Sequence, residues 1–194
     1  MNETLRRPRA MNIDVALAVF CAAGVTAGVI ISVRLDSATL ISLGGAEAKL
    51  ALAAEGRWLR LFFGSFTGIF LMLASSFLFG FCAVAQPFEL LLVMFRGLGL
   101  GICVRGIYLG EDVWRSLAVF LPFAVLSTGV LILASRDSFY LSMRYLSLSS
   151  TNENRLGLRS AVNDYAVKFL IYTVLLALLT FADSFLTRAV LGAA

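Results

Sequence analysis

Five long stretches of this chain are apolar and almost free of charge, and this feature constrains the fold more than any other. A hydrocarbon core of about 30 Å is crossed by about 20 helical residues. Hydrophobic residues fill 60% of the 194 positions and charged residues 14%, whereas soluble domains carry about 25% charged residues. A soluble fold of this length could not bury so much apolar surface. The sequence therefore predicts an all-α integral membrane protein.

The apolar runs predict one membrane domain, 1–194, with about five transmembrane helices. The expected spans are residues 13–33, 61–84, 88–110, 116–135 and 166–186. The segments 35–57 and 136–164 contain helix formers and scattered apolar residues, which favours interfacial amphipathic helices and polar loops. The basic start is also typical of a signal peptide, but the first apolar run is too long for a signal-peptide core, so we expect a retained anchor.

Charged residues inside the predicted spans are the first candidates for function. A charge at mid-membrane costs about 2.5–3.5 kcal/mol on insertion scales, so Arg96 should face protein, water or a partner charge. Glu89 lies on the same helix face, about 10.5 Å away by helical rise, and Asp183 in the last span is the alternative partner. Two interpretations stay open: a polar functional site lined by these three residues, or a buried ion pair or carbonyl-bound arginine that fixes helix packing.

Glycine is the second notable feature. Gly97, Gly99 and Gly101 follow Arg96 at alternate positions, and each weakens a helix by about 1 kcal/mol relative to alanine. The segment near 86–101 is therefore expected to be broken or re-entrant, as in transporters. Glycines four residues apart also permit close helix packing, which is the alternative explanation. Such pairs are Gly24/Gly28, Gly64/Gly68, Gly97/Gly101 and Gly106/Gly110.

Enzymatic functions are disfavoured by the residues that are missing. The chain has no histidine, which excludes Ser-His-Asp triads, Cys-His dyads and zinc sites built on histidine. No GxSxG, SxxK or HExxH motif occurs, and we expect neither a metal nor a cofactor. Arginines that meet anionic lipid head groups explain the net charge of +4. Membrane lipids are thus expected partners, and nucleic acid is not.

Three strings between Phe79 and Ser142 carry a resemblance to a known family. They are GFCAVAQP at 80–87, FRGLGLG at 95–101 and LILASRDS at 131–138. In this pattern the chain resembles the stage II sporulation protein M family, with Ala85 in place of a glycine and Asp137 in place of a glutamate. The family offers no catalytic residues to carry over, so Gln86, Pro87 and Arg96 are the candidates from the motif itself.

The resemblance implies a five-helix protein of the bacterial cytoplasmic membrane with its N-terminus in the cytoplasm. Such a protein is a non-catalytic scaffold that positions two peptidoglycan hydrolases, stage II sporulation proteins D and P, at the septal membrane during engulfment. A homo-oligomer is also compatible with this role. The alternative function is a small transporter, channel or permease subunit that uses Arg96, Glu89 and the glycine segment. An accessory membrane subunit without a site of its own is a third candidate.

Overall fold

The computed structural model describes five helices, all of them long and apolar. It describes residues 7–35, 58–82, 84–109, 113–150 and 155–192. The helices are α1 (Arg7–Ser32), α4 (Trp58–Phe79), α5 (Gln86–Leu109), α6 (Val113–Ser150) and α7 (Arg155–Gly192). Within this part of the chain each helix is long and apolar enough to cross a membrane, and no residue is in a strand. The prediction of an all-α polytopic membrane protein is confirmed.

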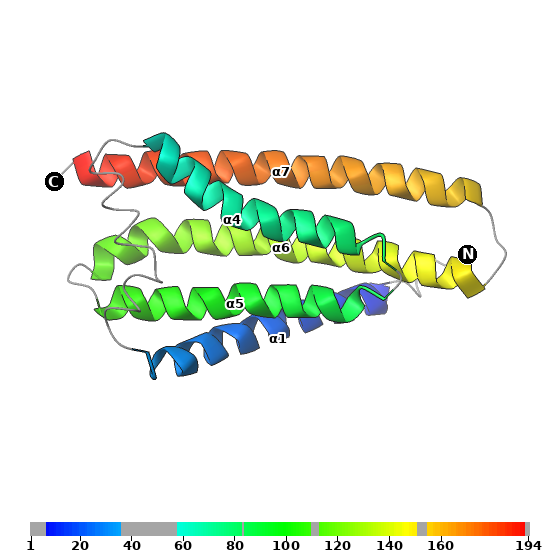
Figure 1. Cartoon of the computed structure of the whole chain (residues 1–194), viewed down its shortest axis with the longest axis horizontal. Coiled ribbons are helices and arrows are strands. Elements are labelled where there is room, and N and C mark those ends of the chain that lie inside the picture. The colour runs from blue at the N-terminus through cyan, green and yellow to red at the C-terminus, as the bar shows by residue number, and fades with distance from the viewer. Residues whose placement is uncertain (1–6, 36–57, 83, 110–112, 151–154, 193–194) are drawn as a thin grey trace.

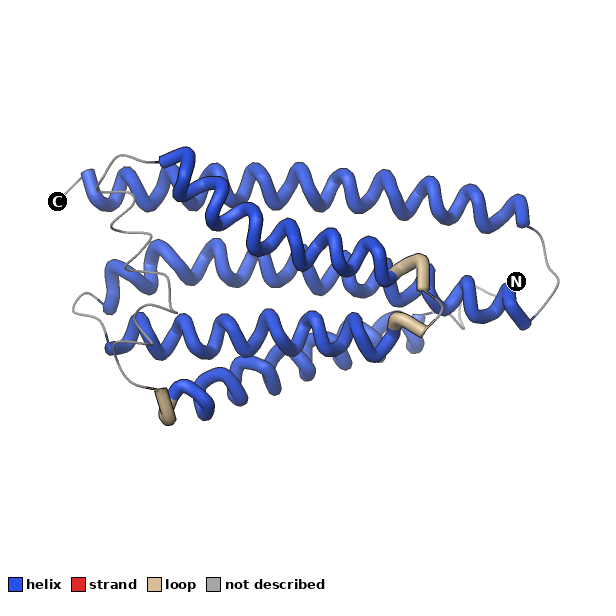
Figure 2. Tube along the Cα trace, in the orientation of Figure 1, coloured by secondary structure: helices blue, strands red, loops and turns tan. Residues whose placement is uncertain are grey.

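The helices form a bundle in which successive members run in alternate directions, so α1 begins and α7 ends at opposite ends of it (Figure 1). Helix α6 lies in the middle and contacts each of the other four helices. Helix α1 packs mainly against α5, whereas α7 packs against α4 and α6. A short turn joins α4 to α5 at the end of the bundle where α1 begins (Figure 2). Residues far apart in the sequence therefore meet along α6.

The turn between α4 and α5 forms where the sequence stops favouring helix. Helix α4 ends at Phe79, earlier than the expected boundary at 84, and Gly80 begins a series of short turns. Phe81 N–H donates to the Leu78 carbonyl at 3.2 Å, and Cys82 N–H donates to the Phe79 carbonyl at 2.9 Å. Pro87 then occupies the first turn of α5, where a backbone N–H is not needed.

The expected break near 86–101 is not present. Helix α5 runs without interruption from Gln86 to Leu109, through all three alternate glycines. The helix tolerates them because Gly97 and Gly101 lie against the backbone of α1. Close backbone contact between helices offsets the lower helix propensity of glycine. The packing explanation is therefore the one that the structure supports for Gly97 and Gly101.

The segment 136–164 does not form the separate interfacial helix and polar loop that the sequence predicts. Helix α6 continues to Ser150 and α7 begins at Arg155, so most of this segment extends two membrane-spanning helices. Each of these helices has 38 residues and is roughly 57 Å long, well beyond the thickness of a hydrocarbon core. Both reach past the α4–α5 turn (Figure 1). The other expected interfacial segment, 35–57, lies outside the described residues except for Leu35.

Aromatic side chains fill the space between α4 and α7. The rings of Phe77 and Tyr165 stack with their centroids 5.4 Å apart, and Phe169 packs 4.6 Å from Tyr165. Leu73 and Leu176 are buried beside them, each 1% exposed. Many apolar side chains on the opposite faces of the spans are exposed, as expected for surfaces that contact lipid. This core fixes α7 against α4 and positions the polar groups described next.

Candidate functional site

The carboxyl group of Glu89 lies where α4, α5 and α6 meet. The side chain is fully buried, at 0% exposed, in the first turn of α5. Ser76 Oγ of α4 lies 3.0 Å from Oε2 and 3.1 Å from Oε1, and Ser138 Oγ of α6 lies 2.6 Å from Oε1. Ser135, one turn earlier on α6, is also fully buried. Glu89 thus joins three helices through serine hydroxyl groups, which we call the Glu89 cluster.

Backbone carbonyl groups at the end of α4 complete this cluster. Ser138 Oγ donates to the Ser76 carbonyl at 2.7 Å, and the Tyr165 hydroxyl of α7 donates to the Phe77 carbonyl at 3.1 Å. A Cβ atom at position 80 would collide with the Tyr165 hydroxyl and lie close to Ser138 Oγ. Gly80 therefore leaves room for the Tyr165 hydroxyl and Ser138 Oγ at the end of α4.

Arg96 binds a different set of groups, near the middle of α5. Its Nη2 donates to Ser127 Oγ at 2.9 Å and its Nε donates to Thr128 Oγ1 at 3.3 Å, both on α6. These two hydroxyl groups also donate to the Ala124 carbonyl one turn earlier, at 3.2 and 2.6 Å. The guanidinium group is therefore held by hydroxyl groups, and its positive charge is not neutralised by a carboxylate in these contacts.

The three residues expected to share one site lie apart. Glu89 and Arg96 each bind their own hydroxyl groups and form no ion pair with one another. Asp183 is buried, at 5% exposed, but it follows Tyr165 by 18 residues on α7. That separation is roughly 27 Å along the helix, and Tyr165 marks the level of the Glu89 cluster. Asp183 therefore lies toward the other end of the bundle from the Glu89 cluster, and the hydrogen bonds of Arg96, its expected partner, go to Ser127 and Thr128.

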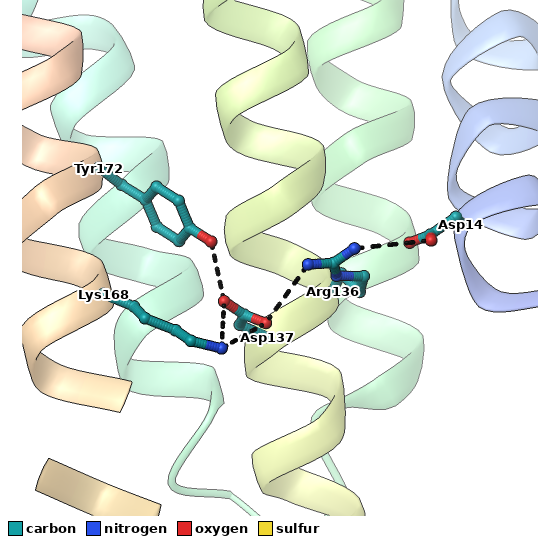
Figure 3. Close-up of polar contacts among 5 residues, drawn as sticks. All are labelled: Asp14, Arg136, Asp137, Lys168 and Tyr172. Atoms are coloured by element: carbon teal, nitrogen blue, oxygen red, sulfur yellow. Dashed lines mark hydrogen bonds and ion pairs between the residues drawn. The ribbon is translucent and has the colours of Figure 1, made fainter. Parts of the chain in front are cut away.

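A second polar network surrounds Asp137, and Figure 3 shows its members. Asp137 is 8% exposed, and its Oδ2 accepts a hydrogen bond from the Tyr172 hydroxyl of α7 at 2.8 Å. Lys168 Nζ, also of α7, lies 3.3 Å from the same oxygen. Arg136 forms ion pairs with Asp137 at 3.9 Å and with Asp14 of α1 at 3.6 Å. The network therefore links α1, α6 and α7.

Three consecutive residues of α6 reach all four other helices, and we call them the α6 triplet: Arg136, Asp137 and Ser138. Arg136 binds α1, Asp137 binds α7, and Ser138 binds both α4 and α5. Successive side chains on a helix point about 100° apart, so three in a row can contact partners around most of its circumference. Polar contacts with every other helix are thereby concentrated within one turn of the central helix.

The backbones of α1 and α5 meet directly at a second kind of contact, the glycine seam of Gly24, Gly28, Gly97 and Gly101. A Cβ atom at any of these four positions would collide with a backbone carbonyl oxygen of the facing helix. Gly99 differs, because a Cβ atom there would meet nothing within 4 Å. Gly97 and Gly101 therefore have a packing role, and Gly99 lies outside the seam.

Replacing Arg96 by leucine is expected to leave the bundle folded. The free energy of unfolding should fall by about 1 kcal/mol, because two interhelical hydrogen bonds of about 0.6 kcal/mol each disappear. Ser127 and Thr128 keep their hydrogen bonds to the Ala124 carbonyl, so no buried hydroxyl loses its acceptor. Unfolding of the purified protein in detergent measures the change. A loss of several kcal/mol in the Arg96→Leu protein would show that the arginine has a further partner.

The residues that sequence reasoning missed are Asp137, Lys168, Tyr172 and the buried serines. The sequence places Asp137 in an interfacial helix, because charges and serines interrupt the apolar run after residue 135. One usable signal was the spacing of Lys168 and Tyr172, which places them on one helix face. Gln86 and Pro87 lie in the first turn of α5 and take no part in these networks.

The described residues do not bring three or more Cys, Asp or Glu side chains together in a group that could hold a metal ion. Comparisons of the chain with family models, with curated proteins and with solved structures find no match. The resemblance to the stage II sporulation protein M family stays a prediction, and function must be argued from the polar contacts.

Proposed function

We propose that this chain is a non-catalytic membrane scaffold. The observation that carries the proposal is the α6 triplet, through which one turn of the central helix binds all four other helices. Polar groups used in this way stabilise one arrangement of the bundle, because each has partners that only that arrangement supplies. A fixed arrangement suits a protein whose task is to hold other membrane proteins in place.

The glycine seam supports the same proposal. Backbone contact between α1 and α5 leaves no room for side chains between them, and such contacts in membranes rest on van der Waals packing. The outward faces of the helices carry large exposed apolar side chains, for example Leu71 at 59% and Leu170 at 66%. These faces could accept lipid or the membrane anchor of another protein.

The partners proposed are membrane-anchored peptidoglycan hydrolases, in the manner of stage II sporulation proteins D and P. We place the protein in the bacterial cytoplasmic membrane with its N-terminus in the cytoplasm, acting at the septal membrane during engulfment. Residues 131–138, part of the sequence resemblance, include the α6 triplet. A motif that resembles the family therefore coincides with the contacts that hold the bundle together.

Co-purification from the native host tests this function. The tagged chain is extracted in mild detergent through growth and into sporulation, and we expect peptidoglycan hydrolases to co-purify with it. The Asp137→Ala variant should insert but recover less hydrolase, because α7 loses its polar contacts with α6. Thr173→Ala is the matched control, since Thr173 Oγ1 bonds only its own helix, at the Phe169 carbonyl. Recovery of transport subunits in place of hydrolases would contradict the proposal.

A transporter or channel subunit is the second candidate, and Arg96 is the observation that favours it. The guanidinium group lies near the middle of a span, and its hydrogen bonds to the described residues go to hydroxyl groups, so its charge is available to attract an anion. Intramembrane ionisable residues often mark ion pathways. Ion flux distinguishes this candidate from the scaffold, as described in the Discussion.

A further inference from the structure

The hydrogen bonds of the Glu89 cluster fix where its protons lie. Ser138 Oγ is 2.7 Å from the Ser76 carbonyl oxygen and 2.6 Å from Glu89 Oε1. A carbonyl oxygen only accepts, so the single hydroxyl proton of Ser138 is the one that must lie between Ser138 Oγ and the Ser76 carbonyl. The contact between Ser138 Oγ and Glu89 Oε1, at 2.6 Å, then needs a proton that is carried by the carboxyl group.

We propose that Glu89 is a proton-binding site and that its carboxylic acid donates this second hydrogen bond. The proton sits on Oε1 and points to Ser138 Oγ, and the Ser138 hydroxyl in turn donates a hydrogen bond to the Ser76 carbonyl. Ser76 Oγ donates to Oε2 at 3.0 Å. Each proton in this series of hydrogen bonds then has an acceptor, and no two acceptors face one another without a proton between them.

The surroundings of Glu89 agree with a neutral acid. The carboxyl group is completely buried, and the groups that contact it include the hydroxyl groups of Ser76 and Ser138. An ionised carboxylate without a counter-charge is costly in such a place. Helix α7 contributes the Tyr165 hydroxyl, whose proton is donated to the Phe77 carbonyl of α4 at 3.1 Å.

The charged groups on the helices around Glu89 have other partners, several of them in the network around Asp137. Asp137, next to Ser138 on α6, binds Lys168 and Tyr172 on α7. Arg136 is paired with Asp14 of α1 and with Asp137. Arg96, seven residues further along α5, binds Ser127 and Thr128. In the described contacts none of these cations pairs with Glu89, so a proton is what balances the charge of this carboxyl group.

Loss of this proton would change the contacts between helices. Glu89 Oε1 and Ser138 Oγ would then be two acceptors 2.6 Å apart, unless Ser138 turned its proton toward the carboxylate and released the Ser76 carbonyl. The end of α4 would lose its bond to α6. The site thus couples proton binding to the attachment of the end of α4 to α6, a property that does not depend on the scaffold function.

Infrared spectroscopy of the full-length protein in phospholipid nanodiscs tests this proposal. At neutral pH we expect a carbonyl stretching band of a buried protonated carboxylic acid. The band should vanish in Glu89→Gln and persist in Asp137→Asn, the matched control. Glu89→Gln should also fold normally, because its amide N–H can donate to Ser138 and its carbonyl can accept from Ser76.

Thermal unfolding across pH supplies the second measurement. The melting temperature of the wild type should fall at alkaline pH by more than that of Glu89→Gln. The absence of the acid band, its persistence in Glu89→Gln, or failure of Glu89→Gln to fold would each overturn the proposal. A sodium-dependent rise in melting temperature that Glu89→Gln abolishes would also overturn it, because the site would then bind an alkali cation.

Discussion

Replacing Gly97 by leucine is expected to separate α1 from α5 and to give one of the largest losses of stability of any single substitution in the chain. A Cβ atom at this position already collides with the Cys21 carbonyl oxygen of α1, and a backbone atom cannot rotate away as a side chain does. Overpacking costs about 1–3 kcal/mol, and we expect leucine at the top of that range or above it. Unfolding by detergent titration measures the loss.

Gly68→Leu on α4 is the matched control for this substitution. A Cβ atom at Gly68 meets nothing within 4 Å, so the same change of residue adds volume toward open space. We expect stability equal to the wild type or somewhat higher, because glycine is about 1 kcal/mol less favourable than alanine inside a helix. Equal losses in the two variants would mean that helix propensity, and not the glycine seam, sets the outcome.

Replacing Asp137 by alanine is expected to produce the second large loss of stability. The substitution removes the acceptor of the Tyr172 hydroxyl and the partner of Lys168, and it leaves Arg136 with Asp14 alone. Removing one partner of a buried hydrogen bond costs about 1–3 kcal/mol. The same unfolding measurement applies, and α7 should detach from α6 before the rest of the bundle unfolds.

Asp14→Asn and Asp137→Asn compare the two carboxylates of this network under one chemical change. Asp14 is 43% exposed and lies 3.6 Å from Arg136, whereas Asp137 is 8% exposed. Exposed ion pairs contribute about 0–1 kcal/mol, so Asp14→Asn should cost less than Asp137→Asn. The reverse order would contradict the assignment of Asp137 as the link to α7.

The membrane spans could be predicted from sequence because apolar runs report burial in lipid directly. The lengths of α6 and α7 could not, since the residues after 135 alternate apolar side chains with serine, arginine and aspartate. Such a pattern is typical of an interfacial helix. In the structure the same polar side chains turn toward neighbouring helices, and their partners lie on segments distant in sequence.

The candidate site illustrates the same limit. Glu89 and Arg96 were identifiable as charges inside a span, but their partners are serine and threonine hydroxyl groups. Serine and threonine are common in membrane helices, so no sequence pattern distinguishes those that bind a charge from those that bond their own backbone. Which hydroxyl groups bind a charge depends on which helices lie side by side, and the sequence does not show that arrangement.

Ion flux through proteoliposomes tests the central claim, that polar groups inside the spans join helices and do not line a pathway. Liposomes containing the purified wild-type protein should be no more permeable to protons, chloride or alkali cations than empty liposomes. The Arg96→Leu protein should behave in the same way. Flux that requires the wild-type protein and disappears in Arg96→Leu would contradict the claim and identify Arg96 as part of a transport path.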